Sequence, residues 1–272
     1  MKVTDIKELQ EVAKKARRNV IEQVYGAGSG HPGGALSCID ILTVLYFNQM
    51  NINPEEPKME ERDRLVLSKG HACAALYAIL AQRGFFPQEE LRNFRKFGSN
   101  LQGHPDMKKL PGIDMSTGSL GQGLSTACGM ALAGKIKKQE NKIYCILGDG
   151  EIQEGQIWEA TMMASQYKLD NLCVIVDNNN LQIDGKVEDV MSPYPIDKKF
   201  ESFGFAVFNV DGNNIEDLIE AFERIKLIKK QPVAIIANTI KGKGISFMEN
   251  KAEWHGKAPN EDEYNKAILE LN

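Results

Sequence analysis

The stretch GDGEIQEGQIWEATMMASQYKLDNLCVIVDNNN, residues 148–180, decides the fold of this chain. It begins directly after an apolar run at 142–147, which predicts a buried parallel strand. Apolar positions at helical spacing then predict a helix over 151–168, and a second apolar run at 171–177 predicts the next strand. Strand, helix and strand in succession are the βαβ unit of a parallel sheet, so we expect an α/β protein.

The turn between the first strand and the helix has the composition of an anion site. Gly148 and Gly150 allow a sharp turn and a close approach of the backbone to a ligand, and free N–H groups at a helix start attract an anion. Asp149 is placed to bind a cation that bridges to such an anion. The second strand ends at Asn178-Asn179-Asn180, and the carboxyl ends of parallel strands are where ligands bind in open sheets. We therefore expect a site for a diphosphate and a metal ion between these two strand ends.

Magnesium is the metal that suits these side chains. Mg²⁺ prefers octahedral oxygen coordination with few protein ligands, and phosphate oxygens and water complete the shell. The Asp149 carboxylate, one asparagine amide oxygen and one backbone carbonyl would form such a partial shell, and the pattern leaves open which of the three asparagines binds. An isolated Asp-Gly pair is usually a turn and an asparagine run is usually a loop. The prediction therefore depends on their occurring together at neighbouring strand ends.

The pairing of Gly148-Asp149-Gly150 with Asn-Asn about thirty residues later resembles the fingerprint of thiamine diphosphate enzymes. The resemblance covers nearly the whole chain, but only the first part of a full-length transketolase. It implies that thiamine diphosphate is the cofactor. Five more motifs are similar to those of transketolases and follow in transketolase order: Ser29-Gly30-His31-Pro32-Gly33, Ser68-Lys69-Gly70-His71-Ala72, Gln102-Gly103-His104-Pro105, Gly118-Ser119-Leu120-Gly121-Gln122-Gly123 and Trp254-His255-Gly256.

The resemblance assigns roles to individual residues around the cofactor. It implies that Asp149, the side chain of Asn179 and the carbonyl of Leu181 bind Mg²⁺ or Ca²⁺. Asn178 stands where transketolases often carry Asp. The resemblance also implies cofactor contacts from His71, Gly118, Leu120, Gly148, Gly150 and Asn179.

All four histidines of the chain occur in these motifs. Imidazoles donate hydrogen bonds to hydroxyl groups and transfer protons near neutral pH. The resemblance implies that His31, His104 and His255 contact the sugar, and that His71 faces the diphosphate. Glu154 is expected one turn into the predicted helix, where the helix dipole would favour it by about 0.3–1 kcal/mol. The family further implies that Glu154 links to another cofactor site across a subunit interface.

The activity implied by the resemblance is transketolase, the transfer of a two-carbon ketol unit from a ketose phosphate to an aldose phosphate. Transketolases carry the glutamate that activates the cofactor, and most sugar-phosphate contacts, on a second domain beyond the part that this chain resembles. The expected partner is therefore a separately encoded C-terminal transketolase subunit, in an α2β2 assembly. Sugar phosphates are the expected substrates.

Three alternatives stay open at the level of sequence. The chain could correspond to part of a 1-deoxyxylulose-5-phosphate synthase or to the α subunit of a 2-oxo acid dehydrogenase first component, although the four histidine motifs in order favour transketolase. It could also be a cofactor-binding module without turnover. Such a module has no reason to keep all four histidines together with Asp149 and Asn179.

The remainder of the chain continues the alternation of strands and helices. We find no internal repeat, low-complexity tract or linker, so we expect one thiamine-diphosphate-binding domain over residues 1–272. Helices are expected at 5–25, 35–50, 72–82, 88–94, 124–136, 151–168, 215–228 and 261–271. Five apolar runs predict a doubly wound, mainly parallel sheet with helices on both faces: 64–68, 142–147, 171–177, 205–210 and 232–238.

Composition excludes several other classes of protein. Of the 272 residues 42% are hydrophobic, and no apolar run approaches the roughly twenty residues that a membrane helix needs. A net charge of −4 gives no general attraction to nucleic acid. The N-terminus mixes charges and lacks the pattern of a signal peptide, which indicates the cytoplasm. The five cysteines have no metal-ligand spacing and are expected to be buried thiols.

Overall fold

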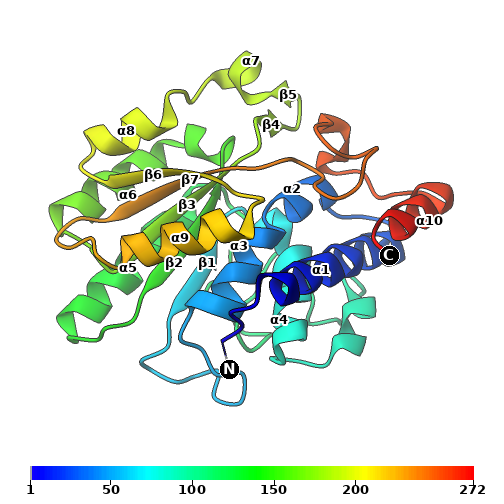
Figure 1. Cartoon of the computed structure of the whole chain (residues 1–272), viewed down its shortest axis with the longest axis horizontal. Helices are drawn as coiled ribbons and strands as arrows, with labels where there is room; N and C mark the ends of the chain where they lie inside the picture. The colour runs from blue at the N-terminus through cyan, green and yellow to red at the C-terminus, as the bar shows by residue number, and fades with distance from the viewer. Residues whose placement is uncertain (1) are drawn as a thin grey trace.

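The computed structural model describes residues 2–272 of the chain. Its centre is a five-stranded, all-parallel sheet with the strand order β1-β2-β3-β7-β6 (Figure 1). Each strand overlaps one of the five predicted apolar runs, so the sheet predicted from the sequence is confirmed. The strands are β1 (Arg64–Leu67), β2 (Ile143–Gly148), β3 (Leu172–Asn178), β6 (Ala206–Asp211) and β7 (Val233–Asn238).

Helices cover both faces of this sheet, which confirms the doubly wound architecture (Figure 1). Ile146 and Ile175 belong to the core on one face, and Leu147 and Val176 to the core on the other. Because both faces are buried, these strands are apolar throughout instead of alternating. The first face is covered by α1 (Ile6–Ala27), α3 (Ile39–Val44), α4 (Cys73–Arg83) and α9 (Ile215–Ile225), and the second by α5 (Gln122–Ile136), α6 (Gly155–Gln166) and α8 (Ile196–Ser202).

Local capping chemistry sets several helix ends. The Asp5 carboxylate accepts from the N–H groups of Lys7 (2.7 Å) and Glu8 (3.2 Å) at the start of α1. Asn214 caps α9 in the same way. Asn260 begins α10 (Glu261–Glu270) with a reciprocal capping box. These caps satisfy N–H groups that have no partner within their helices.

The single helix predicted over 35–50 is wrong. The chain forms α2 (Pro32–Ser37), then α3, then one π-helical turn (Leu45–Gln49). The first break falls at Cys38, whose backbone leaves helical geometry (φ −99°, ψ 9°). Directly before it, the hydroxyl of Ser37 bonds to the Asp177 carboxylate on β3 (2.5 Å). This buried tether to the sheet is a long-range contact, so helical periodicity does not reveal it.

The helix predicted over 151–168 is also interrupted. It begins with a 3₁₀ turn (Glu151–Gln153), and α6 starts only at Gly155. The Glu151 carboxylate turns back to accept from the N–H groups of Gly148 (3.0 Å) and Gly121 (2.9 Å). Glu154 is therefore the residue before α6, with extended backbone (φ −68°, ψ 129°), and the prediction that it lies one turn inside the helix is wrong.

The segment between β3 and β6, for which the sequence analysis predicts no helix or strand, contains several short elements. After Asn180 it forms a short antiparallel hairpin and then two helices before β6. The predicted helix over 88–94 is a 3₁₀ helix. The hairpin consists of β4 (Leu181–Gln182) and β5 (Gly185–Lys186), and α7 (Val187–Met191) follows it. Further 3₁₀ turns are Gly70–Ala72, Gln88–Asn93 and Ala252–His255.

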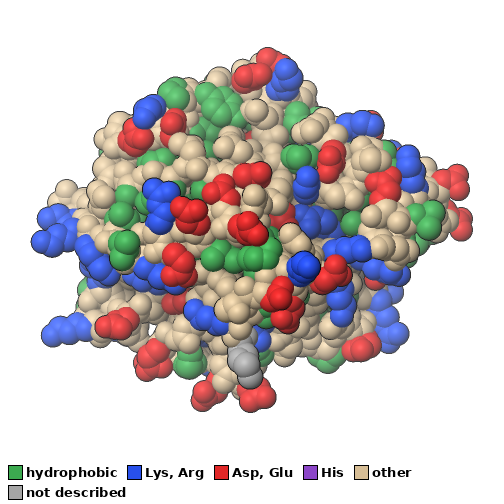
Figure 2. Space-filling model, in the orientation of Figure 1, with side chains coloured by type: hydrophobic (Ala, Val, Ile, Leu, Met, Phe, Trp, Pro, Cys, Tyr) green, Lys and Arg blue, Asp and Glu red, His purple; other side chains and the backbone are tan. Residues whose placement is uncertain are grey.

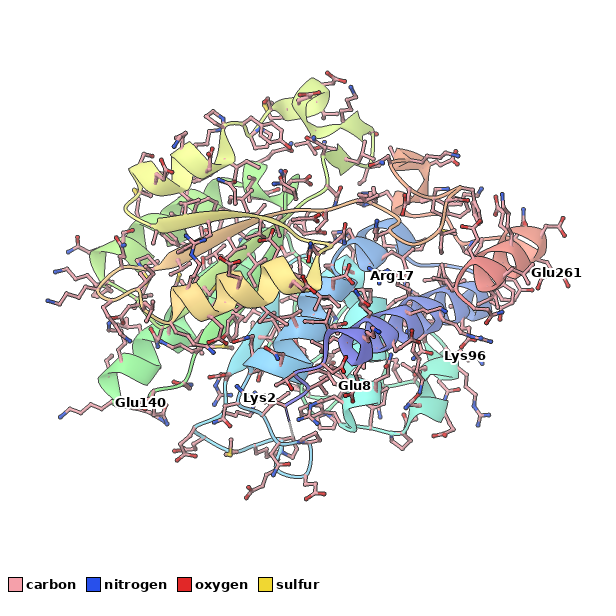
Figure 3. The ribbon with its side chains drawn as sticks, viewed as in Figure 1. Lys2, Glu8, Arg17, Lys96, Glu140 and Glu261 are labelled. Carbon is pink, nitrogen blue, oxygen red and sulfur yellow. The ribbon has the colours of Figure 1, made fainter. Side chains whose placement is uncertain are left out.

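Acidic and basic side chains are intermixed over the face shown in Figure 2. Arg17 of α1, which is labelled in Figure 3, is instead buried and forms an ion pair with Asp40 of α3. All five cysteines are buried and unpaired, which confirms that prediction. Among the described residues, no helix has both the length and the apolar character needed to cross a membrane.

Candidate active site

A cavity of about 330 Å³ lies at the carboxyl ends of β2 and β3. Gly148, the last residue of β2, pairs with Asp177 of β3, so the Gly-Asp-Gly turn and the asparagine run project from adjacent strands. Every predicted site residue except His104 lines this cavity: His31, His71, Gly118, Leu120, Gly148, Asp149, Gly150, Glu154, Asn179, Leu181 and His255.

Asp149 is a buried carboxylate, with 3% of its surface exposed. Its Oδ1 accepts from the N–H of Gly150 (2.8 Å) and its Oδ2 from the N–H of Asn180 (2.5 Å). Burial, followed by repulsion from Asp177, raises the pKa of Asp149 to about 6. A bound cation would stabilise the charged form of such a carboxylate.

The structure distinguishes between the three asparagines. Asn179 is buried and lines the cavity, and its Oδ1 accepts from the N–H of Leu181 (3.2 Å). The hydroxyl of Tyr194 instead lies within hydrogen-bonding distance of the amide oxygens of both Asn178 and Asn180. Their amide oxygens therefore point to a tyrosine that the cavity lining does not include. This placement favours Asn179 as the asparagine that faces a ligand.

Two buried lysines that the sequence analysis did not select also line the cavity. Lys69 pairs with Asp177 and donates to the carbonyl of Gly34 (2.6 Å). Burial opposes its charge, but Asp177 outweighs that effect and the pKa of Lys69 is raised. Lys241 donates to the carbonyl of Leu181 (3.0 Å), and burial together with Lys69 lowers its pKa to about 8. The signal that could have found both is a lysine closely following a buried strand.

Three histidines form a compact cluster beside the Gly-Asp-Gly turn. The ring centroids lie 5.3 Å apart for His31 and His71, 5.6 Å for His31 and His255, and 5.2 Å for His71 and His255. Burial, then Arg95, lowers the pKa of His31 to about 4; burial, then Lys241, lowers that of His255 to about 3. Burial also holds the pKa of His71 well below its usual value. All three imidazoles are therefore neutral near pH 7, where they donate and accept hydrogen bonds.

His104 stands apart from this cluster and is exposed. Its ring packs on Gly118, which has a positive φ of 148°, and a Cβ at Gly118 would lie 3.1 Å from two atoms of the imidazole. Only a glycine leaves room for the ring at this position. Because Gly118 lines the cavity, His104 is adjacent to its rim.

Two glutamates have different places at the site. Glu151 is buried and accepts from the hydroxyl of Ser68 as well as from the two backbone N–H groups, and burial raises its pKa. It connects β1, the start of α5 and the Gly-Asp-Gly turn. Glu154 is exposed at the rim of the cavity. It lies close to Gly121, where an added Cβ would be 2.8 Å from Cβ of Glu154. Sequence reasoning selected Glu154 and missed Glu151.

Fold and cavity together define the class: a doubly wound α/β protein whose ligand site combines buried oxygen donors, two buried lysines and a histidine cluster at the carboxyl ends of parallel strands. Residues 9–271 match the model of the family described as "Transketolase, thiamine diphosphate binding domain". The chain belongs to the transketolase family, as a ketol-transferase component with the thiamine-diphosphate-binding domain. The resemblance stated from the motifs is confirmed.

Relatives of two lengths match this chain. It is 44% identical over 267 residues to one subunit of the apulose-4-phosphate transketolase of Phocaeicola vulgatus, covering 98% of this chain and 95% of that one. It is 46% identical over 264 residues to one subunit of the 6-deoxy-6-sulfo-D-fructose transketolase of a Clostridium species, covering 97% and 96%. The solved transketolase of Campylobacter jejuni superimposes with a TM-score of 0.93 at 37% identity, covering 98% of this chain and 43% of that one. The chain thus spans about two-fifths of that transketolase.

Proposed function

We propose that this chain, as a single domain over residues 1–272, is the cofactor-binding subunit of a two-subunit transketolase. It transfers a two-carbon ketol unit from a ketose phosphate to an aldose phosphate. The observation that carries the proposal is the shared cavity, because three neutral histidines lie beside the Asp149 and Asn179 pair. Relatives that this chain covers almost fully are named as single subunits of a transketolase, which supports a separately encoded partner.

The donor set fits a divalent cation and a diphosphate. Asp149, Asn179 and the carbonyl of Leu181 are oxygen donors of the kind that Mg²⁺ or Ca²⁺ prefers, and burial and the neighbouring Asp177 raise the pKa of Asp149. We propose that these three residues hold the metal and that Gly148 and Gly150 approach the diphosphate. When bound, thiamine diphosphate supplies an electron sink for cleavage of a carbon–carbon bond.

The chain's own residues bind and orient the reactants. His31 and His255 would donate N–H groups to sugar hydroxyls inside the cavity, and His71 would face the diphosphate. His104 would contact the sugar from the rim, because its ring packs on Gly118. Neutral imidazoles act here as hydrogen-bonding groups without adding positive charge. Which sugars are used stays open, since the relatives' names refer to apulose 4-phosphate and to a sulfonated fructose.

The partner would cover α5 and α6, the two helices around the cavity on the second face of the sheet. Gly129 of α5 is exposed, and a Cβ there would meet no atom within 4 Å. Met162 of α6 is 53% exposed. Small residues allow close helix packing and exposed apolar side chains favour burial, so this face suits an interface. We propose an α2β2 heterotetramer in the cytoplasm in which Glu154 lies at a contact between chains, with no nucleic-acid or membrane partner.

The test is to assay the purified chain, the purified partner and their mixture with cofactor and Mg²⁺, while mass in solution is measured. Ketol transfer should require the mixture. His31→Ala and His255→Ala should reduce turnover more than cofactor affinity, because these residues face the sugar. Full ketol transfer by this chain alone would refute the two-subunit proposal. Pyruvate decarboxylation without ketol transfer would instead favour a synthase or dehydrogenase function.

A further inference from the structure

We propose that Arg95 is a positioning residue that holds the imidazole of His31 in the tautomer with its proton on Nε2 and joins the loops that carry His31 and His104. The catalytic consequence rests on the proposed function, because it assumes that His31 donates to a sugar. Arg95 does not line the cavity and would act through His31.

The guanidinium of Arg95 lies between two loops. Its Nη2 is 3.4 Å from Nδ1 of His31 and 3.5 Å from the carbonyl of Gly103, and its Nη1 is 3.4 Å from the hydroxyl of Ser29. Ser29 and His31 belong to the glycine-rich loop before α2, and Gly103 directly precedes His104. One planar group therefore connects the two segments that carry sugar-facing histidines.

The chemistry of the contact selects the tautomer of His31. A guanidinium has five N–H donors, no acceptor, and cannot lose a proton in a protein. Nδ1 of His31 must therefore accept in this contact, which leaves the proton of the neutral ring on Nε2. The Nε2 edge faces the opposite way, where a Cβ at Gly256 would lie 3.9 Å from Nε2 and 3.8 Å from Cδ2. The N–H of His31 is thus directed away from Arg95, on the side of Gly256.

The segment around Arg95 is shaped for this contact. Arg95 has a positive φ of 57°, which is uncommon for a residue with a side chain, and its N–H donates to the carbonyl of Leu101 (2.8 Å). A Cβ at Gly103 would lie 3.1–3.2 Å from three guanidinium atoms, so a glycine is needed where the arginine passes. The guanidinium also lies over the Phe94 ring, 5.5 Å from its centroid.

The electrostatic surroundings agree with a neutral His31. The groups that act on it are Arg95, His104 and Lys241, all of which disfavour a proton, together with the neighbouring rings of His71 and His255. Burial acts in the same direction. His31 therefore stays neutral under assay conditions, and the question that Arg95 decides is which nitrogen carries the proton.

The direct test is the ¹⁵N spectrum of histidine-labelled full-length chain, with His31 assigned by its loss in His31→Asn. In the wild-type chain Nε2 should appear protonated and Nδ1 unprotonated. Arg95→Lys should keep that tautomer, because an ammonium is also a pure donor. Arg95→Met should give a mixture of tautomers. A wild-type spectrum with the proton on Nδ1 overturns the proposal without any variant.

Kinetics of the two-subunit enzyme give the second readout. Arg95→Met should lower kcat/KM for the ketose by about fivefold to tenfold, the effect of one misdirected hydrogen bond. Arg92→Met is the matched control, because Arg92 is an exposed arginine three residues earlier, on the 3₁₀ helix Gln88–Asn93, and it should change neither the spectrum nor the rate. An unchanged tautomer in Arg95→Met overturns the proposal. Absence of ketol transfer in the wild type would refute the proposed function, while the spectrum still decides the role of Arg95.

Discussion

Replacing Lys69 by methionine should destabilise the chain strongly, because it leaves a buried carboxylate without its cation. The Asp177 side chain is completely buried. Besides Lys69, its side-chain donors among the described residues are neutral: the hydroxyls of Ser37 (2.5 Å) and Thr239 (2.5 Å) and the amide of Asn179 (3.4 Å). Removing one partner of a buried ion pair costs about 3–5 kcal/mol, a large part of the roughly 5–15 kcal/mol that holds a domain folded.

The assay is urea unfolding of the chain followed by circular dichroism, without cofactor or metal. Lys69→Met should lower the free energy of unfolding with little change in the m-value. In the double variant with Asp177→Asn, the total loss should be smaller than the sum of the two single losses, because the pair is coupled. Lys198→Met is the control, since Lys198 forms an exposed ion pair with Glu201 (2.8 Å) and should behave as wild type. A loss below about 1 kcal/mol, the range of surface pairs, or strict additivity would refute the reasoning.

Three further predictions concern packing, pH and the metal. Gly123→Ala should lower the free energy of unfolding by about 1–3 kcal/mol, because the new Cβ would lie 2.6 Å from Cβ of Ser68. Gly129→Ala on the same helix should instead stabilise the isolated chain by about 0.5–1 kcal/mol and weaken assembly with the partner. Urea unfolding measures the two stabilities, and sedimentation measures the assembly. The free energy of unfolding should fall as pH decreases from 6.5 towards 4. Over this range His31 and His255 become protonated in the unfolded chain but stay neutral in the folded chain, where their pKa values are about 4 and 3. A pH series of unfolding curves that is flat over this window would contradict the prediction. Chelation of the metal, or Asn179→Ala, should weaken thiamine diphosphate binding by more than about tenfold, whereas Asn178→Ala should leave the affinity nearly unchanged. Calorimetry of the two-subunit enzyme measures these affinities. Equal affinity in all cases would refute the metal assignment.

Much of the fold follows from local patterns in the chain. The five strands are buried on both faces and therefore appear as short apolar runs, and Asp5 and Asn214 show the chemistry of helix caps. The spacing from Asp149 to Asn179 equals one helix plus one strand, so it places both residues at neighbouring strand ends. These features follow from residue types and from spacings along the chain, so the sequence alone indicates them.

Other features depend on partners that lie far away along the chain. The ion pair of Lys69 and Asp177 joins residues 108 positions apart, and the break before α3 depends on Ser37 reaching that same carboxylate. Asn178 bonds to Tyr194 and Asn238 whereas Asn179 faces the cavity, and Glu151 leaves the helical pattern to accept from the N–H of Gly121 thirty residues earlier. Each of these outcomes depends on a polar side chain whose hydrogen-bond partner lies in another part of the chain. Periodicity records which face of an element is buried, but only the packed structure brings such partners within hydrogen-bonding distance.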